Sequence, residues 1–142
     1  MLSVRRKWSL LSLNSFGLVL LLVDFLSKYW FWSRGEYVEN TGVSFGWQFG
    51  NDWWWILVFI CLCWWWSRLK DESRVGERMI ILGGVANLID RLVYGRVIDW
   101  INLEFVGLWI NLADLYISAG LGIMLVDYWR FRNKQVNENK EA

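Results

Sequence analysis

The stretch Trp53-Trp-Trp-Ile-Leu-Val-Phe-Ile-Cys-Leu-Cys-Trp-Trp-Trp66 contains no charged residue, and three consecutive tryptophans close each end. Tryptophan is enriched where a helix crosses the two membrane–water interfaces. At a rise of ~1.5 Å per residue, a helix over this stretch is about 21 Å long, which is short for a span. The tryptophan triplets nevertheless lie where the two interfaces would be, so the stretch predicts a short membrane-spanning helix.

The composition of the whole chain agrees with a membrane protein. Of its 142 residues, 56% are hydrophobic and 13 are Trp, which is more aromatic surface than a soluble domain of this length can bury. The length allows one compact domain, so we expect residues 1–142 to form a single membrane domain. The net charge of only +1 gives no reason to expect a nucleic-acid partner.

The residue types that usually bind metals are scarce. The chain has no His, and its two cysteines, Cys61 and Cys63, both lie in the apolar stretch. We therefore expect no metal and no cofactor, and we assign both cysteines to lipid-facing or packing positions. Because His is absent, any acid–base chemistry must be carried out by carboxylates.

Three further apolar segments predict three further helices. The four predicted spans are about 9–32, 53–67, 77–92 and 113–130. The first follows a basic start and could be mistaken for a secretory signal, but it is too long and no small-residue cleavage site follows it. We expect the polar tail, 133–142, to be frayed.

The distribution of basic residues predicts the orientation of these helices. Of the 15 basic residues, 11 lie at the N-terminus, in the loop 67–78 and in the tail from Arg130 onward. The positive-inside rule makes all three places cytoplasmic. We therefore predict an all-α membrane fold of four transmembrane helices, with both termini inside and with segments 33–52 and 93–112 outside.

Two local patterns concern packing. Residues 97–103 read as a short extended stretch whose faces are mostly apolar, as expected of a segment that rests on the membrane surface. Small residues on the last two predicted helices permit close helix approach: Gly83, Gly84, Gly120 and Gly122.

Polar side chains gather at the predicted outer ends of the helices, where ionisable groups are costly unless they have a partner or a function. Asp24 and Lys28 lie one turn apart on the first helix, so they can pair, and a purely local pair with Lys28 reaching outward is one interpretation. The other members of this group lie on the third helix, the fourth helix and the extended stretch between them: Asn87, Asp90, Arg91, Asp99, Asn111 and Asp114.

The spacing of this group predicts a polar pocket at the outer boundary of the membrane. Asn87, Asp90 and Arg91 share one helix face, and Asn111 and Asp114 are three residues apart. Two neighbouring carboxyls do not easily ionise together, so one can activate water while the other protonates a carbonyl oxygen. Spacing alone leaves open which two of the four aspartates form the pair, and a purely structural network is the alternative.

The order of these residues resembles the lipoprotein signal peptidases, the bacterial signal peptidase II family. Five segments carry the resemblance, in family order between residues 24 and 114. They are Asp24-Phe-Leu-Ser-Lys28, Asn40-Thr-Gly-Val-Ser-Phe-Gly46, Gly83-Gly-Val-Ala-Asn-Leu-Ile-Asp-Arg91, Gly95-Arg-Val-Ile-Asp99-Trp and Asn111-Leu-Ala-Asp114. Each segment alone has low specificity, whereas the five together are highly specific.

The resemblance implies an aspartic intramembrane peptidase that cuts the signal peptide of a prolipoprotein just before its lipid-modified Cys. It makes Asp99 and Asp114 the catalytic pair. It implies site-lining and substrate-contacting roles for Asn40, Asn87, Arg91 and Asn111, and supporting roles for Asp24, Lys28 and Asp90. It also implies a small β-rich periplasmic cradle at about 33–52 and a short lid at about 100–111.

The resemblance also implies a place for the protein in the cell. We expect a monomer in the bacterial inner membrane, with its site at the periplasmic face and with the prolipoprotein and membrane lipids as partners. Phe25, Ala86 and Trp100 depart from the family's usual Gln, Gly and Phe at these positions, and the stretch between the two catalytic aspartates is short.

Two other classes of protein fit part of the pattern. A small proton-coupled transporter would also place carboxylates in four helices, but it predicts polar residues near mid-membrane. A non-catalytic assembly subunit would use the same cluster to bind a partner helix, and it would tolerate Asp-to-Asn changes at residues 99 and 114.

Overall fold

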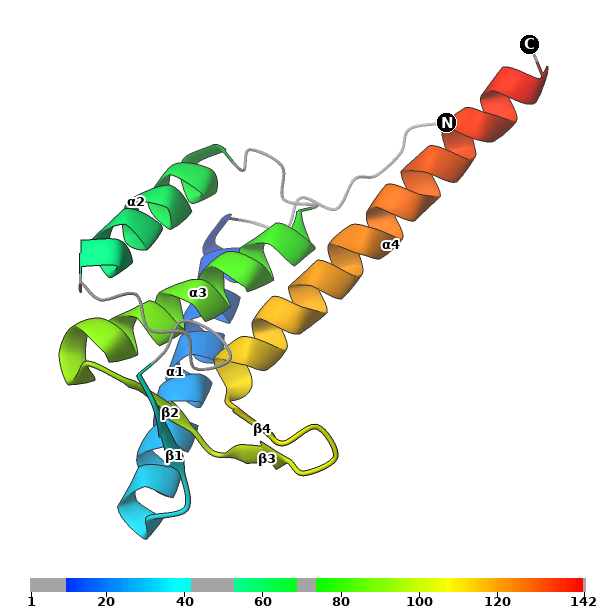
Figure 1. Cartoon of the computed structure of the whole chain (residues 1–142). Coiled ribbons are helices and arrows are strands. Elements are labelled where there is room, and N and C mark those ends of the chain that lie inside the picture. The colour runs from blue at the N-terminus through cyan, green and yellow to red at the C-terminus, as the bar shows by residue number, and fades with distance from the viewer. Residues whose placement is uncertain (1–9, 42–52, 69–73, 142) are drawn as a thin grey trace.

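Four helices make up most of the described chain. The computed structural model describes residues 10–41, 53–68 and 74–141. The basic N-terminus, Lys70 and residues 42–52, which include part of the second family-like segment, lie outside the described residues. The helices are α1 (Leu10–Arg34), α2 (Trp53–Arg68), α3 (Val75–Tyr94) and α4 (Leu112–Glu141), as Figure 1 shows.

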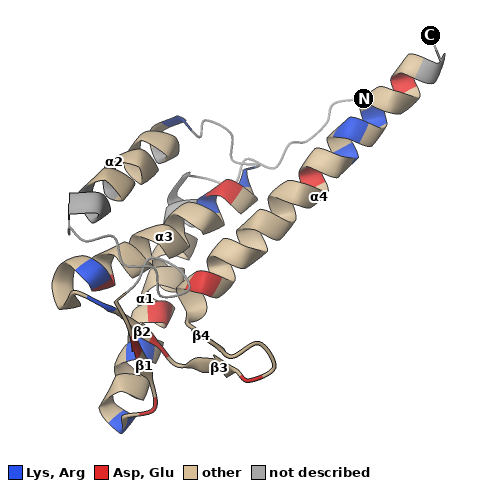
Figure 2. Ribbon diagram, in the orientation of Figure 1, with Lys and Arg blue, Asp and Glu red and all other residues tan. Residues whose placement is uncertain are grey.

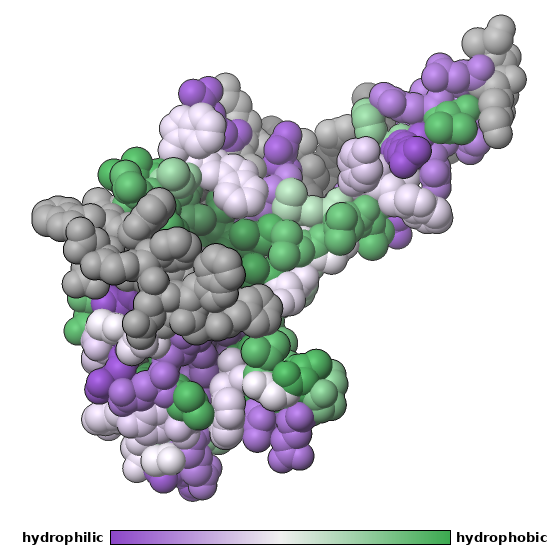
Figure 3. Space-filling model, in the orientation of Figure 1, coloured by the Kyte–Doolittle hydropathy of each residue, from purple (hydrophilic) through white to green (hydrophobic). Residues whose placement is uncertain are grey.

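Two helical segments in the described part of the chain are long and apolar enough to cross a membrane: Phe16–Arg34 and Leu112–Asn139. Exposed apolar side chains run along both, including Leu18, Leu22 and Leu26 on α1 and Leu121 and Leu125 on α4. Figure 3 shows a hydrophobic surface over the middle of α4 and a hydrophilic C-terminal end, while the β3–β4 hairpin carries both hydrophobic and hydrophilic residues. This distribution is that of helices solvated by lipid along their middle.

Helix α3 lies at the centre of the helical part, where it packs most extensively on α4 and also contacts α1 and α2. Glycines allow the close contact with α4. A Cβ at Gly76 would lie 2.7 Å from the carbonyl oxygen of Gly120, and a Cβ at Gly83 would overlap the carbonyl oxygen of Ala113. Gly84 instead faces Leu62 of α2, and Gly122 has no neighbour within 4 Å, so the expected close approach at Gly122 is wrong.

Two small antiparallel sheets lie at one end of the helices, beside the start of α4 (Figure 1). Strands β1 (Val38–Asn40) and β2 (Val97–Asp99) form the first sheet, in which Val38 pairs with Asp99. Strands β3 (Ile101–Leu103) and β4 (Leu108–Ile110) form the second. The predicted extended stretch 97–103 is therefore present as β2 and β3, which meet at Trp100.

Helix α4 is longer than the sequence led us to expect. The predicted end near residue 130 and the frayed tail are replaced by a helix that runs to Glu141 and projects beyond the other elements (Figure 1). The tail contains good helix formers, no Pro and no Gly after Gly122. Lys134 and Glu138 also form an ion pair at 3.8 Å, with the i, i+4 spacing that supports an exposed helix.

The buried core of the described chain follows α3 and extends to β2 and the start of α4. The buried apolar residues are Ile81, Ala86, Leu88, Val97, Ile98 and Ala113. They come from α3, β2 and the first turn of α4, and buried polar side chains lie among them. The packed part of the molecule is thus the region that holds the predicted site.

Candidate active site

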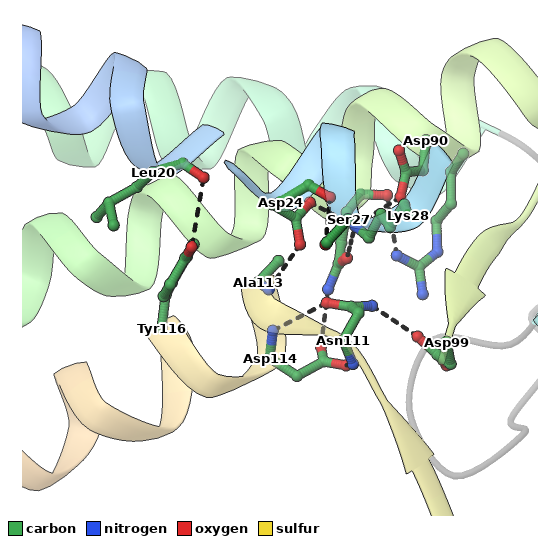
Figure 4. A network of polar contacts seen from close by, with 12 residues as sticks. Leu20, Asp24, Ser27, Lys28, Asp90, Asp99, Asn111, Ala113, Asp114 and Tyr116 are labelled. Atoms are coloured by element: carbon green, nitrogen blue, oxygen red, sulfur yellow. Dashed lines mark hydrogen bonds and ion pairs between the residues drawn. The ribbon is translucent and has the colours of Figure 1, made fainter. Parts of the chain in front are cut away.

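Lys28 is buried at the centre of an ion-pair cluster. Its Nζ lies 2.7 Å from Asp24 Oδ2 and 2.7 Å from Asp90 Oδ2, and it donates a hydrogen bond to Asn87 Oδ1 over 3.0 Å. Only 3% of Lys28 is exposed, so the ammonium points inward to α3 and does not reach outward. The predicted Asp24–Lys28 pair is present, and Asp90 and Asn87 extend it to a second helix (Figure 4).

Asp24 also fixes the start of α4. Its Oδ1 accepts a hydrogen bond of 2.9 Å from the backbone N–H of Ala113, in the first turn of that helix. First-turn N–H groups have no partner within the helix, and a carboxylate there is favoured by the helix dipole. One side chain therefore joins α1 to the residue that precedes Asp114.

Asn111 caps α4 and joins the two candidate catalytic aspartates. Its Oδ1 accepts the backbone N–H of Asp114 over 3.1 Å, and its own backbone N–H donates to Asp114 Oδ2 over 3.1 Å. This reciprocal arrangement has the geometry of a capping box. The Nδ2 of Asn111 donates to Asp99 Oδ1 over 2.6 Å, so a single amide contacts both acids (Figure 4).

Asp99 lies at the end of β2, with 2% of its surface exposed. The strand pairing places Asn40 of β1 opposite Val97, two residues before Asp99, and Asn40 Nδ2 donates to Asp99 Oδ2 over 2.9 Å. Burial raises the pKa of the Asp99 carboxyl above its ordinary value; the hydrogen bonds from Asn40 and Asn111 oppose this rise, and the charge of Asp114 adds to it.

Asp114 receives a further hydrogen bond from α3. Asn87 Nδ2 donates to Asp114 Oδ1 over 2.7 Å, while Arg91 Nη1 donates to the backbone carbonyl of Asn87 over 3.1 Å. Asn87 and Arg91 are one helical turn apart, so the predicted shared face of α3 points at the start of α4.

Asp99 and Asp114 line the same cavity. Its volume is about 260 Å³. The polar part of its lining is Asn40, Asn87, Arg91, Asp99, Asp114 and Ser118, and the apolar part is Val97, Leu108, Trp109, Ile110 and Ile117. A cavity of this kind can hold an extended peptide segment, with its polar groups at the carboxylates and its side chains on the apolar wall.

A second cavity of about 210 Å³ lies on the other side of Lys28. It is lined by Phe25, Lys28, Tyr29, Trp32, Asp90, Tyr94, Arg96 and Ile98. Its lining includes neither Asp99 nor Asp114.

The structure brings together six of the nine residues that the sequence singled out. Asn40, Asn87, Arg91, Asp99 and Asp114 line the first cavity, and Asn111 lies directly behind the two acids. Asp24, Lys28 and Asp90 form the cluster beside it. Among residues 10–41, 53–68 and 74–141, no group of three His, Cys, Asp or Glu side chains is arranged to hold a metal ion.

Sequence reasoning missed the apolar wall of the cavity. Leu108, Trp109 and Ile110 belong to β4, and no polar or spacing signal distinguishes them from other apolar residues. It also missed the backbone N–H of Ala113 as the partner of Asp24, because a backbone group has no signature in the sequence.

Comparison with known proteins identifies the family of the chain. Residues 16–130 match the family model described as signal peptidase (SPase) II. The chain belongs to this family. The resemblance found in the sequence is thereby confirmed, and the protein is a member of a family of proteases.

Individual relatives agree with this assignment. The chain is 29% identical over 136 residues to the lipoprotein signal peptidase of Streptococcus pyogenes serotype M1, covering 80% of this chain and 90% of that protein. It is 34% identical over 106 residues to the lipoprotein signal peptidase of Photorhabdus laumondii subsp. laumondii, covering 64% and 63% of the two chains.

Solved structures share the fold of this signal peptidase II family member. A bacterial membrane enzyme determined by the in meso method at 2.3 Å resolution matches with a TM-score of 0.67 at 18% identity, over 80% of this chain and 85% of that one. A second, at 1.9 Å resolution, matches with a TM-score of 0.63 at 18% identity, over 79% and 88% of the two chains. The chain therefore has the fold of a membrane enzyme.

Proposed function

We propose that this protein is a membrane-embedded aspartic endopeptidase that removes the signal peptide from diacylglyceryl-modified prolipoproteins and cuts just before the lipidated Cys. Membership of the signal peptidase II family and the names of the relatives support the removal of signal peptides from prolipoproteins. The observation that carries the aspartic mechanism is the placement of Asp99 and Asp114 on one cavity, with Asn111 hydrogen-bonded to both.

The two acids take different roles. Asp99 is the more deeply buried, and its pKa is raised, so it holds the shared proton at rest and acts as the general acid. Asp114 acts as the general base: it takes a proton from a water molecule, whose oxygen then bonds to the scissile carbonyl carbon. Asp99 gives its proton to the carbonyl oxygen in the same step.

The second half of the reaction restores both acids. When the tetrahedral intermediate collapses, the C–N bond breaks and Asp114 passes the proton from water to the leaving amine. The intermediate's hydroxyl returns its proton to Asp99 as the new carboxyl group forms. Asn40, Asn87 and Asn111 keep the two carboxyls in place, and Arg91 lies on the same cavity, where it can contact the peptide backbone.

All four helices cross the membrane in this proposal, with both termini in the cytoplasm and the site at the periplasmic face of the inner membrane. Figure 2 supports this orientation. More basic residues lie at the end of α2, at the start of α3 and in the C-terminal part of α4 than beside the sheets, where Lys28, Arg34, Arg91 and Arg96 lie. The positive-inside rule then puts the sheets outside.

The sheets would act as a cradle, and the β3–β4 hairpin as a short lid. Strand β4 supplies Leu108, Trp109 and Ile110 to the cavity wall, so a movement of this hairpin would open or cover the cavity. A diacylglyceryl group anchors the substrate in the bilayer and fixes the depth of its scissile bond, which reduces the search for carboxylates at the interface. In this proposal the protein acts as a monomer among membrane lipids.

The test uses purified protein in detergent and a diacylglyceryl-modified lipobox peptide. We expect the parent to cleave the peptide, and Asp99→Asn and Asp114→Asn to abolish cleavage while insertion and thermal unfolding remain close to the parent's. Asp127→Asn is the matched control, because Asp127 is exposed on α4 far from the cavity, and it should cleave like the parent. Cleavage by either dyad variant would refute the roles of the two acids, and no cleavage by the parent under several lipid conditions would favour transport or partner binding.

A further inference from the structure

Lys28 contacts more than its ion-pair partners. Two oxygens near its ammonium belong to carboxylates, Asp24 and Asp90, and the third belongs to the amide of Asn87. The three N–H donors of the buried ammonium thus have three acceptors, and the amide of Asn87 is the neutral one. The contact with Asn87 lies on the path from Lys28 to Asp114.

The chemistry of Lys28 fixes which way the amide of Asn87 points. An ammonium group has donors and no acceptor, so the atom of Asn87 that faces it must be Oδ1. The Nδ2 group of the same amide then faces Asp114 Oδ1 over 2.7 Å. With the amide reversed, Nδ2 would face the ammonium and Oδ1 would face a carboxylate, so both contacts would become repulsive.

A second path leads from the same cluster to the same acid. Asp24 binds Lys28 through Oδ2 and the backbone N–H of Ala113 through Oδ1. Ala113 immediately precedes Asp114. The ion pair on α1 is therefore connected to Asp114 through a side chain of α3 and through the backbone of α4 (Figure 4).

We propose that Lys28 is a positioning residue for Asp114: its buried ammonium orients the amide of Asn87 so that Nδ2 donates to the Asp114 carboxylate. This inference rests on the proposed function, because it concerns the geometry of the same catalytic pair. Lys28 does not line the cavity of Asp99 and Asp114, so it acts on the reaction only through other residues.

The test must remove the ammonium without leaving two unpaired carboxylates buried. Lys28, Asp24 and Asp90 together carry a charge of +1 − 2 = −1, and Lys28→Met with Asp90→Asn also leaves −1. Asp90→Asn alone is the reference chain, because the effect of the change at Asp90 is then present on both sides of the comparison. We expect Lys28→Met in this background to lower kcat by about 100-fold with little change in KM, the size of effect that a misplaced catalytic group produces.

A double-mutant cycle separates orientation from stability. Asn87→Leu removes the donor to Asp114, so Lys28→Met should lower kcat no further once Asn87→Leu is present. If Lys28→Met lowers kcat by the same factor with and without Asn87→Leu, the inference is overturned, because Lys28 then does not act through Asn87. Thermal unfolding of all four chains shows whether any loss of kcat reflects loss of the fold.

If the Lys28→Met variant does not fold, Asn87→Asp provides a second test. An Asp at this position can still accept a hydrogen bond from Lys28, but it has no N–H for Asp114. We expect a folded protein with the low kcat of Asn87→Leu, and parent-like activity would overturn the inference.

The experiments distinguish a failure of the proposed function from a failure of this inference. If the parent does not cleave the lipidated peptide, or if Asp114→Asn cleaves it, the aspartic mechanism is wrong. If the parent cleaves, Asp114→Asn does not, and the cycle is additive, then only the role of Lys28 is refuted.

Discussion

Asn111 donates a hydrogen bond of 2.6 Å from its side-chain amide to Asp99 Oδ1, and this contact bridges two parts of the fold. Asp99 ends a strand and Asn111 precedes a helix, so neither secondary element alone sets the distance between the acids. The amide cannot turn over freely, because its Oδ1 accepts the backbone N–H of Asp114. The relative position of the two acids is therefore controlled by the cap of α4.

Replacing Asn111 by Ser separates its two roles. Ser is also a good N-cap, so the helix should start normally and the unfolding temperature should change little. Ser is too short to reach Asp99, and we expect the rate of lipopeptide cleavage to fall by about 100-fold. Asn102→Ser is the control, because Asn102 is exposed on β3, and it should cleave like the parent. An active Asn111→Ser protein would show that this amide does not set the geometry of the acids.

The raised pKa of Asp99 makes a prediction about stability. Because the folded state binds this proton more tightly than the unfolded state, ionising Asp99 destabilises the fold as pH rises above the ordinary value near 3.8. Asp99→Asn removes this contribution. The free energy of unfolding of Asp99→Asn minus that of the parent should therefore increase as pH rises through the acidic range, and then level off once the folded-state carboxyl has ionised.

Denaturant unfolding in detergent at a series of pH values measures this difference. The prediction concerns how the difference in free energy of unfolding changes with pH, not how large it is. Its size also reflects the hydrogen bonds with Asn40 and Asn111, which Asp99→Asn changes. Asp127→Asn, at an exposed site, should show no such trend relative to the parent. A difference that is constant with pH would contradict the raised pKa.

Gly83 is the position where packing between helices most directly affects the site. A Cβ there would overlap the backbone carbonyl of Ala113 and lie 2.7 Å from Ile117 Cγ1. Gly83→Ala should displace the start of α4, and with it Asp114, and overpacking of this kind costs about 1–3 kcal/mol of stability. We expect lower thermal stability together with reduced cleavage.

Gly122 provides the control for this change on α4. A Cβ at Gly122 has nothing within 4 Å, so Gly122→Ala should leave cleavage unchanged and stability equal or slightly higher. Equal effects of the two substitutions would show that close α3–α4 contact is not what Gly83 provides.

Local spacing predicted part of this site, and long-range packing supplied the rest. The i, i+4 rule correctly placed Asp24 beside Lys28, and the helix period correctly placed Asn87 and Arg91 on one face. Neither rule indicated that Lys28 reaches Asn87 of another helix, because that contact depends on how α1 packs on α3. For the same reason, spacing could not decide which two of the four aspartates form the catalytic pair. Only the family resemblance selected Asp99 and Asp114.

The C-terminal end of α1 contacts the strand that carries Asp99. The ring of Phe31 stacks on that of Trp100 with centroids 4.0 Å apart and planes 7° from parallel, and Trp100 immediately follows Asp99. The backbone N–H of Trp100 also donates to Ile110 of β4 over 3.1 Å. This stack therefore fixes both small sheets to α1.

Phe31→Leu should loosen these sheets without unfolding the helices. An aromatic pair contributes about 0.5–1.5 kcal/mol beyond its buried area, so amide hydrogen exchange in residues 97–103 should become roughly twofold to tenfold faster. Trp30→Leu is the control, because Trp30 is exposed on the same helix and its ring contacts Arg34 rather than the sheets. Trp100→Phe keeps a ring against Phe31 and should exchange like the parent. Unchanged exchange in Phe31→Leu would show that the sheets are held by their backbone hydrogen bonds alone.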